Sequence, residues 1–161
     1  LLAATPQRGD HLVAYCRRKM PANVLEALAA SPCEVRVYGL GEQPDRGPLR
    51  FRPISEDGFI ADLASARAVV GTAGNQLLGE VLYLGKPVLA LPEAGQTEQL
   101  INCHFLARMG GGEWVRPHRF DGPTLGAFLE RADGLAANID RDFARGNERA
   151  VGAIEQVLAS L

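Results

Sequence analysis

The chain has 161 residues, of which 47% are hydrophobic and 22% charged, and its formal net charge is −2. This composition suits one soluble globular domain that buries its own core. The negative charge gives no support to a nucleic-acid partner, because binding to a phosphate backbone favours a basic surface. No apolar run reaches the length of a membrane-spanning helix and no signal peptide opens the chain, so membrane contact is not indicated.

Strand and helix patterns alternate along the first half of the chain. Short apolar or alternating runs predict strands, and apolar residues three and four positions apart predict helices. In chain order, we expect a strand over 11–16, a helix over 22–30, a strand over 34–38, a loop over 39–48, a strand over 50–52, a helix over 56–66 and a strand over 68–71.

The alternation continues through the second half. We expect a helix over 75–84, a strand over 88–91, a helix over 98–109, a strand over 113–115 and helices over 124–136 and 140–161. Gly85 and Pro87 follow the helix over 75–84, as is usual at a helix end. Residues 1–9 lack an initiator methionine and are interpreted as a linker, residues 10–161 as one domain, and the chain as part of a longer protein.

These elements predict an α/β fold with a parallel, doubly wound (Rossmann-like) sheet of about six strands. The strands at 68–71 and 88–91 are continuously apolar, which is typical of strands covered on both faces. In such sheets the ligand binds beyond the carboxyl ends of the strands, at the switch in strand order. We therefore expect the site in the loops after Cys16, Gly71 and Leu91.

Cysteine usage bears on the compartment. Cys16, Cys33 and Cys103 are widely spaced, odd in number and without a C-x-x-C pair. This arrangement argues against a disulfide framework or a zinc site and favours the reducing cytoplasm.

The turn Gly71-Thr72-Ala73-Gly74 joins a buried strand to a helix that begins at Asn75-Gln76. The first amides of a helix have no internal partner, and the helix dipole places partial positive charge there, so a phosphate can bind. The hydroxyl of Thr72 is a further donor. The structural alternative is that the two glycines only shape a tight turn.

Three further polar positions follow this turn. Glu80, within the helix, has a carboxylate that can accept both hydroxyls of a ribose, or it is an ordinary solvated helix residue. Glu98 and Gln99, with Asn102 three residues later, can bind the hydroxyls of a sugar. Their structural alternative is a capping arrangement at a helix start.

Together these residues form a pattern: small-x-Gly, Glu80 six residues later, Gly-Lys-Pro-Val-Leu-Ala-Leu-Pro over 85–92, then Glu-Gln-x-x-Asn from Glu98. The pattern resembles the donor-binding signature in the C-terminal half of GT-B glycosyltransferases. It is similar to UDP-glycosyltransferases and to the lipid II-forming GlcNAc transferase. The resemblance is densest from about Gly58 to Gly112.

The resemblance implies a role for each matching residue. Gly74 and the amides of Asn75 and Gln76 would hold the diphosphate, and Thr72 stands where many relatives have a histidine. Glu80 would bind the ribose hydroxyls.

For the rest of the donor, Glu98 and Gln99 would bind the transferred sugar, and Ile60, with Phe59, would contact the base. In the family the nucleoside is usually uridine, and the resemblance implies the same here. Arg17, Arg18 and Lys19 are candidates for a cationic clamp on the diphosphate, or they form a solvated basic turn.

The implied function is the donor-binding domain of a glycosyltransferase, which transfers a sugar from a nucleotide diphosphate, expected to be UDP, to an acceptor hydroxyl. No metal or other cofactor is expected, because the nucleotide sugar is the substrate. No catalytic residue is assigned. Relatives hold the acceptor and the general base mostly in an N-terminal domain, so we expect this chain alone to bind without turnover. The alternatives are a nucleotide-sugar 2-epimerase-like domain, a non-catalytic binding subunit of a split transferase, or a doubly wound domain with another phosphate ligand.

Overall fold

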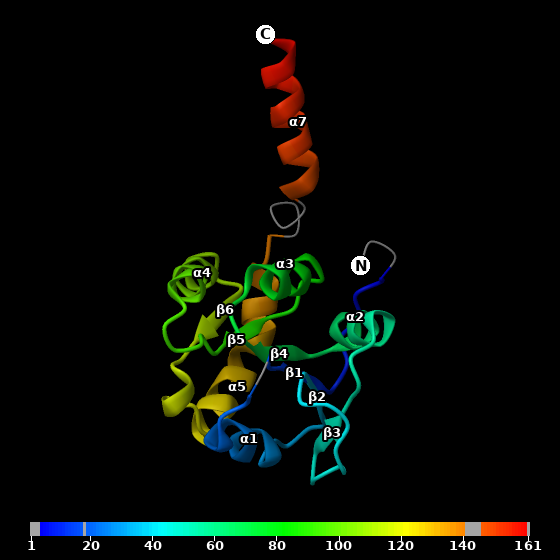
Figure 1. The fold of residues 1–161 in the computed structure, drawn as a ribbon, viewed down its shortest axis with the longest axis vertical. Coiled ribbons are helices and arrows are strands. Elements are labelled where there is room, and N and C mark those ends of the chain that lie inside the picture. Colours follow the sequence, from blue (N-terminus) through cyan, green and yellow to red (C-terminus); the bar gives the residue numbers. More distant parts are fainter. Residues whose placement is uncertain (1–3, 18, 141–145, 161) are drawn as a thin grey trace.

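A computed structural model describes residues 4–17, 19–140 and 146–160 (Figure 1). Its centre is a six-stranded sheet in which every neighbouring pair of strands is parallel. The strands are β1 (Leu12–Tyr15), β2 (Val35–Tyr38), β3 (Leu49–Phe51), β4 (Ala68–Gly71), β5 (Val88–Ala90) and β6 (Gly112–Trp114). The predicted fold class is therefore confirmed, and each predicted strand is present with bounds within one residue.

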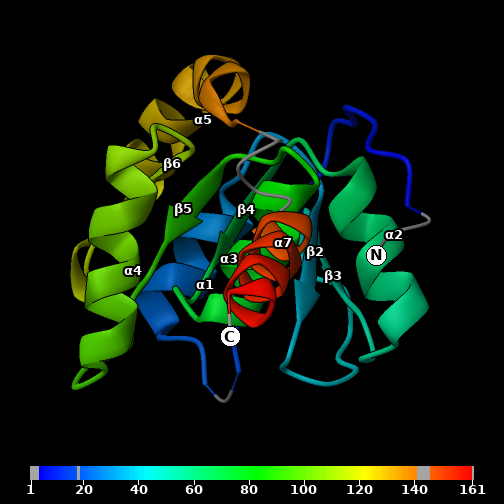
Figure 2. The ribbon, with the colours of Figure 1, turned by 90° about the horizontal axis from the view of Figure 1, so that it is seen from above.

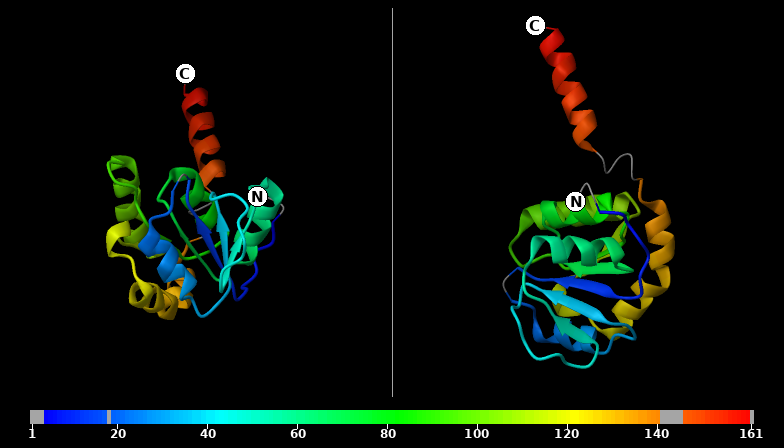
Figure 3. Two further views of the ribbon diagram at one scale, coloured as in Figure 1. Left: turned by 60° about the horizontal axis from the view of Figure 1, so that its bottom comes forward. Right: turned by 90° about the vertical axis from the view of Figure 1, so that its right-hand side faces the viewer.

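Helices cover both faces of the sheet, as the right-hand view of Figure 3 shows. They are α1 (Ala22–Ala29), α2 (Glu56–Ser65), α3 (Asn75–Tyr83), α4 (Thr97–Arg108), the short 3-10 helix η1 (Pro117–Arg119), α5 (Gly122–Asn138) and α7 (Gly146–Ala159). Residues of α1 and α5 share one buried core with the sheet, and residues of α2, α3 and α4 share the other. The continuously apolar strands follow from this double coverage.

The strand order is β3-β2-β1-β4-β5-β6, so successive strands are added toward one edge up to β3 and toward the other edge from β4, and the order switches between β1 and β4. Tyr15, the last residue of β1, is paired in register with Gly71, the last residue of β4. Figure 2 shows α2 and α4 on either side of α3 above this part of the sheet. The switch in strand order opens a space beyond the carboxyl ends, where ligands of doubly wound sheets bind.

Local signals set the helix ends around that space. The Ser55 hydroxyl accepts a hydrogen bond from the Gly58 amide at 3.3 Å and caps the start of α2. α3 ends before Gly85, which has a φ of +68°, a backbone conformation that would be strained for a residue with a side chain. Pro87 follows two residues later. The predicted end of this helix is confirmed. The 3-10 helix η1 was not predicted, because three residues carry no periodic pattern.

The described part of the predicted linker, residues 4–9, is attached to the domain. The Gln7 amide donates to Ala64 O at 2.8 Å, and Arg8 pairs with Asp133 at 2.7 Å. The buried Lys86 ammonium donates to Gln7 O, and to Ala66 O at 2.9 Å. Lys86, part of the Gly-Lys-Pro resemblance, thus joins the start of the chain to the domain core.

The C-terminal helix differs from the sequence-based expectation. A helix was predicted from Asp140, but Asp140 is not helical, and α7 begins at Gly146; residues 141–145 and 161 lie outside the described residues. Figure 1 shows α7 standing away from the sheet, and its apolar stripe of Val151, Ile154 and Leu158 is exposed. Within the described ranges, no helix combines the length and apolarity needed to cross a membrane.

Candidate functional site

A cleft of about 670 Å³, here called the main cleft, opens beyond the carboxyl ends of β1 and β4. The residues predicted to bind the donor all line it: Ile60, Thr72, Gly74, Asn75, Gln76, Glu80, Glu98 and Gln99. They come from α2, the turn before α3, α3 itself and α4. The structure therefore brings together the residues that the sequence pattern singled out, although they span forty positions of the chain.

The first turn of α3 forms one wall of the main cleft. The first helical hydrogen bond runs from the Leu78 amide to Gly74 O at 3.1 Å. Gly74 is the N-cap residue of α3, and among the described residues no side chain accepts a hydrogen bond from the first amides of this helix. The amides of Asn75, Gln76 and Leu77 precede that bond, and all three residues line the cleft. A helix start of this kind presents N–H donors and partial positive charge to an anion.

The two glycines of the preceding turn have different reasons to be glycine. A Cβ on Gly71 would lie 2.9 Å from Leu77 Cδ2 and 3.1 Å from Tyr15 O, so the fold itself excludes a side chain there. A Cβ on Gly74 would meet nothing within 4 Å, and the φ of Gly74 is −69°. The structural alternative therefore accounts for Gly71, whereas at Gly74 neither packing nor backbone conformation requires glycine.

Glu80 and Gln76 lie one helical turn apart on the same wall. Gln76 Nε2 donates to Glu80 Oε1 at 3.1 Å. Among the described residues this is the one hydrogen bond of the Glu80 carboxylate, so its acceptor capacity faces the cleft.

Glu98 and Gln99 differ in burial and in their hydrogen-bond partners. Glu98 is exposed at the cleft, and its Oε1 accepts from Asn102 Nδ2 at 3.0 Å. Gln99 is buried, and its Oε1 accepts from the Glu93 amide at 2.8 Å while its Nε2 donates to Glu93 Oε2 at 3.3 Å. The Gln99 amide group thus holds the loop after β5. Asn102 does not line the cleft; its Nδ2 also donates to Ala73 O at 2.9 Å, which joins α4 to the turn before α3.

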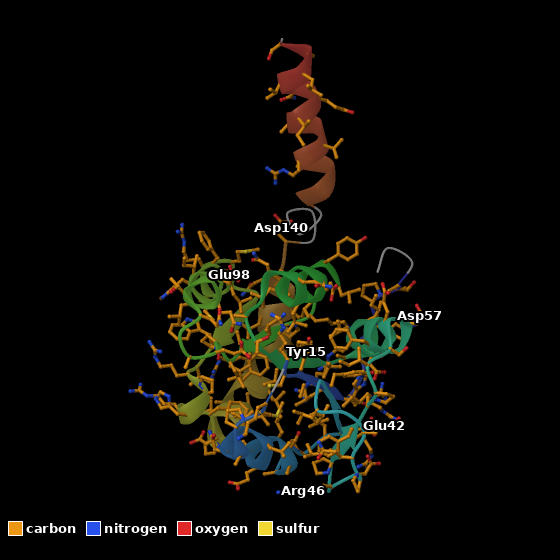
Figure 4. All side chains as sticks on the ribbon, in the orientation of Figure 1. Tyr15, Glu42, Arg46, Asp57, Glu98 and Asp140 are labelled. Atoms are coloured by element: carbon orange, nitrogen blue, oxygen red, sulfur yellow. The ribbon has the colours of Figure 1, made fainter. Side chains whose placement is uncertain are left out.

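Three aromatic rings, from β1, β2 and α2, pack together in the lining of the main cleft. The Phe59 ring centroid lies 4.9 Å from that of Tyr38, edge to face, and 5.5 Å from that of Tyr15. All three residues line the cleft, and Figure 4 shows Tyr15 near the centre of the domain. Such contacts give a firm apolar wall against which a flat ring can pack.

Charged residues behind this wall form a paired group, here called the Asp62 cluster. Asp62 accepts from Arg36 Nη1 and from the Tyr38 hydroxyl, each at 2.5 Å, and Arg36 Nε also pairs with Glu34 at 2.8 Å. Burial, with a further contribution from Asp62, raises the pKa of Tyr38, so its hydroxyl stays protonated as a donor. His11 Nε2 lies 3.1 Å from Asp62 O, and burial lowers the pKa of this imidazole.

A second cavity, of about 550 Å³, adjoins the main cleft. Four residues line both: Tyr15, Thr72, Glu93 and Gln96. The basic residues after β1 are divided between the two spaces, because Arg17 lines the main cleft and Lys19 the second cavity. Arg18, the third candidate for the cationic clamp, lies outside the described residues.

Sequence reasoning did not single out Tyr15, Glu93 or Gln96. Tyr15 ends β1 and Glu93 follows β5, so the rule that ligands bind beyond strand ends points to both positions. His104, two residues after Asn102 on α4, does not line the main cleft; it is exposed and packs edge to face on Trp114, with ring centroids 5.3 Å apart.

One family model matches most of the chain, and solved structures share its fold. The model of glycosyl transferase family 1 matches residues 1–133. Among solved structures, the chain is similar to CalG4, the calicheamicin glycosyltransferase, with a TM-score of 0.68, 18% identity, and coverage of 99% of this chain and 47% of that one. No curated protein matches the sequence.

Two further structures have the same fold. Glycosyltransferase VinC, solved in complex with dTDP, gives a TM-score of 0.64 at 18% identity, covering 97% of this chain and 43% of that one. MurG of Acinetobacter baumannii gives 0.61 at 16% identity, covering 96% and 50%. The chain thus spans about half the length of the solved structures that it matches.

Proposed function

The chain belongs to glycosyl transferase family 1 and has the fold of the C-terminal half of a GT-B glycosyltransferase, and from that premise we propose that its main cleft binds the nucleotide diphosphate of a sugar donor. One observation carries the proposal. The start of α3, with its uncapped amides and an unobstructed Gly74, opens into the same cleft as Glu80 and Glu98.

The proposed donor lies across the cleft in three parts. The diphosphate takes the amides of Asn75 and Gln76 and the Thr72 hydroxyl, because these donors suit an anion. The ribose hydroxyls donate to the Glu80 carboxylate. The base contacts Ile60 and Phe59, which line the cleft from α2. We propose UDP as the nucleotide; the dTDP bound by VinC has a similar pyrimidine base, so both nucleotides belong in the test.

The transferred sugar then lies near Glu98, at the start of α4. In the reaction, the acceptor oxygen bonds to the anomeric carbon of the sugar as the bond from that carbon to the diphosphate oxygen breaks. The electron pair of that bond leaves with the nucleoside diphosphate, and the acceptor proton passes to a general base that we expect in another domain. Amides already oriented at the helix start stabilise the charge that develops on the leaving group.

Titration of the chain with UDP, dTDP, ADP and GDP, followed by backbone amide NMR shifts, tests the proposal. We expect shifts at residues 72–76 and at Glu80, larger with the two pyrimidine nucleotides. Because the chain spans about half the length of the solved structures that it matches, we expect a weak affinity, micromolar to millimolar, about −8 to −4 kcal/mol. No shift at these positions with any nucleotide at millimolar concentration would contradict the proposal. We expect no sugar transfer by the chain alone.

Two variants separate the proposed roles. Glu80→Ala is expected to weaken bare UDP at least about tenfold, because the ribose loses its acceptor. Glu98→Ala should leave bare UDP unchanged and weaken only the sugar nucleotide. Glu26→Ala, an exposed change on α1, is the matched control for both. Equal effects of Glu80→Ala and Glu98→Ala on bare UDP would contradict this division.

A further inference from the structure

Asn102 is the residue of the Glu-Gln-x-x-Asn pattern that the donor proposal leaves without a role. It lies on α4, half-buried, and lines neither the main cleft nor the second cavity. Its side-chain nitrogen Nδ2 carries two hydrogens and donates to two acceptors, Ala73 O at 2.9 Å and Glu98 Oε1 at 3.0 Å. One amide group therefore connects the turn before α3 with the carboxylate that we assign to the sugar.

The geometry of α4 alone does not account for this arrangement. Residues four positions apart on a helix are neighbours, so a hydrogen bond from Asn102 to Glu98 by itself would be an ordinary pair on the helix surface. Ala73, however, lies 29 positions before Asn102 and is buried in the turn between β4 and α3. The bond to Ala73 O fixes the Asn102 amide against that turn while the same nitrogen donates to Glu98.

Helix capping does not explain Glu98, which is labelled in Figure 4. Gln96, the residue before α4, has no side-chain cap, and its own amide donates to Glu93 O at 3.2 Å. The capping alternative is therefore absent from the residues that the structure describes. Glu98 is exposed in the first turn of α4, lines the main cleft, and keeps acceptor capacity beyond its bond from Asn102.

We propose that Asn102 is a positioning residue for the transferred sugar, because it holds the Glu98 carboxylate in a set place relative to the turn that we assign to the diphosphate. This inference rests on the proposed donor function and deepens it. In a sugar nucleotide the sugar is bonded directly to the diphosphate, so a carboxylate that accepts its hydroxyls must lie at a fixed reach from the diphosphate site. Asn102 acts through Glu98 and does not contact the donor.

The side-chain amide of Asn102 gives the first test, because its two hydrogens have separate signals in nitrogen-correlated NMR spectra. In Glu98→Ala one hydrogen loses its acceptor, and its signal should move upfield while the signal of the hydrogen bonded to Ala73 O stays in place. Glu98 is exposed, so this variant folds. The side-chain amide of Asn138, exposed on α5, is the internal control. Unchanged Asn102 signals would overturn the inference.

Affinity for bare and for sugar-linked nucleotides gives the second test. The probes are UDP and dTDP, with UDP-glucose, UDP-N-acetylglucosamine and dTDP-glucose. The measured quantity is the ratio of the Kd of the bare nucleotide to that of its sugar nucleotide, taken for the sugar with the largest ratio. Asn102→Ala should lower this ratio about fivefold, and no further than Glu98→Ala does, while the Kd of the bare nucleotide changes less than about twofold. Asn138→Ala, the same change outside both spaces, should leave both quantities unchanged.

A double-mutant cycle separates positioning from direct contact. If Asn102 acts through Glu98, adding Asn102→Ala to Glu98→Ala should change the ratio by less than about a further twofold. Losses that multiply in the double variant would show that Asn102 contributes independently of Glu98. Equal losses for bare and sugar-linked nucleotide in Asn102→Ala would show a structural role only. Either result would overturn the inference.

Failure of this inference and failure of the donor function give different results. If UDP binds as proposed and no sugar nucleotide binds more tightly than its bare nucleotide, the positioning role fails while nucleotide binding stands. If no nucleotide binds, the donor function fails and the positioning role with it. If Asn102→Ala does not fold, the amide signals of Asn102 in Glu98→Ala still decide the inference.

Discussion

The main cleft and the Asp62 cluster are both rich in polar side chains, but their hydrogen-bonding groups are used differently. In the Asp62 cluster, the carboxylate of Asp62 is taken up by Arg36 and Tyr38. In the main cleft, within the part of the chain that the structure describes, no side chain caps the amides at the start of α3, and the Glu80 carboxylate has one partner, Gln76. The two regions are neighbours, since Tyr38 belongs to both.

The difference shows how to distinguish a binding residue from a structural one. A charged side chain whose partners lie within the fold stabilises that fold, and breaking the pair costs free energy of unfolding. A polar group that faces open space has capacity for a ligand. Gln99 lines the main cleft, but both ends of its side-chain amide are hydrogen-bonded to Glu93. By this criterion Gln99 is a structural residue, like those of the Asp62 cluster.

The largest expected effect is that of Gly74→Asp on nucleotide binding. An aspartate at this position caps α3 and occupies the amides that we assign to the diphosphate, and its charge repels the ligand. We expect UDP affinity to fall at least about 100-fold while stability stays level or rises by a few tenths of a kcal/mol. Isothermal titration and thermal unfolding measure the two effects.

The control for Gly74→Asp is Gly79→Asp, which adds the same charge on α3 at an exposed position outside the cleft. UDP affinity should change less than about threefold there, because screening weakens charge interactions over distance. Equal losses in the two variants would show that net charge, and not the helix start, controls binding.

Asp62→Ala should produce the opposite pattern. It leaves the Tyr38 hydroxyl without its partner and Arg36 with only Glu34, so we expect a loss of about 1–3 kcal/mol in the free energy of unfolding. UDP affinity should stay within about threefold. Asp133→Ala breaks an exposed pair with Arg8 and should cost less than about 1 kcal/mol. A large loss of UDP affinity in Asp62→Ala at unchanged stability would show that the Asp62 cluster takes part in binding and is not only structural.

Gln99→Ala tests the residue that belongs to both descriptions. The Glu93 amide loses its acceptor, so its hydrogen exchange should quicken about tenfold, the equivalent of one hydrogen bond. The Leu91 amide, which donates to Gly71 O, should keep its protection and serves as the internal control. If hydrogen exchange of the Glu93 amide is unchanged and affinity for the sugar nucleotide alone is lost, Gln99 binds the sugar directly.

The smallest effect concerns pH and His11. Because burial lowers the pKa of His11 below the ordinary 6.5, the folded state favours the neutral imidazole. That contribution to stability is complete above pH 6.5 and is lost as the pH falls below it toward the folded-state pKa. Urea unfolding at pH 8 and pH 5 should show a smaller decrease for His11→Gln than for the native chain. His104→Gln, at an exposed position, should retain the native decrease.

Much of the site was predictable because its residues follow strand ends. Parallel strands place their carboxyl ends at one edge of the sheet, so the loops after β1, β4 and β5 had to meet there. Periodicity located the strands within one residue, and the turn around Gly74 and the acids Glu80 and Glu98 followed. Asp140 marks where this approach failed, because the apolar stripe of the last helix predicted a helix from Asp140, and Asp140 is not helical.

The sequence by itself determined the alternating α/β fold, the loops after Cys16, Gly71 and Leu91 as the place of the cleft, and the residue types that line it, since these depend on periodicity, on local signals at helix ends and on the rule for parallel sheets. Only the tertiary structure decided which residues are already bonded within the fold. The Asp62 cluster, the close approach of Tyr15 to Gly71, and the hydrogen bonds from Asn23 to Pro117 O and Phe120 O all join segments that are distant along the chain. The hydrogen bonds between Gln99 and Glu93 span only six residues, but they too form only in the folded loop after β5. Such contacts depend on how packed elements approach one another, and no local pattern specifies that approach.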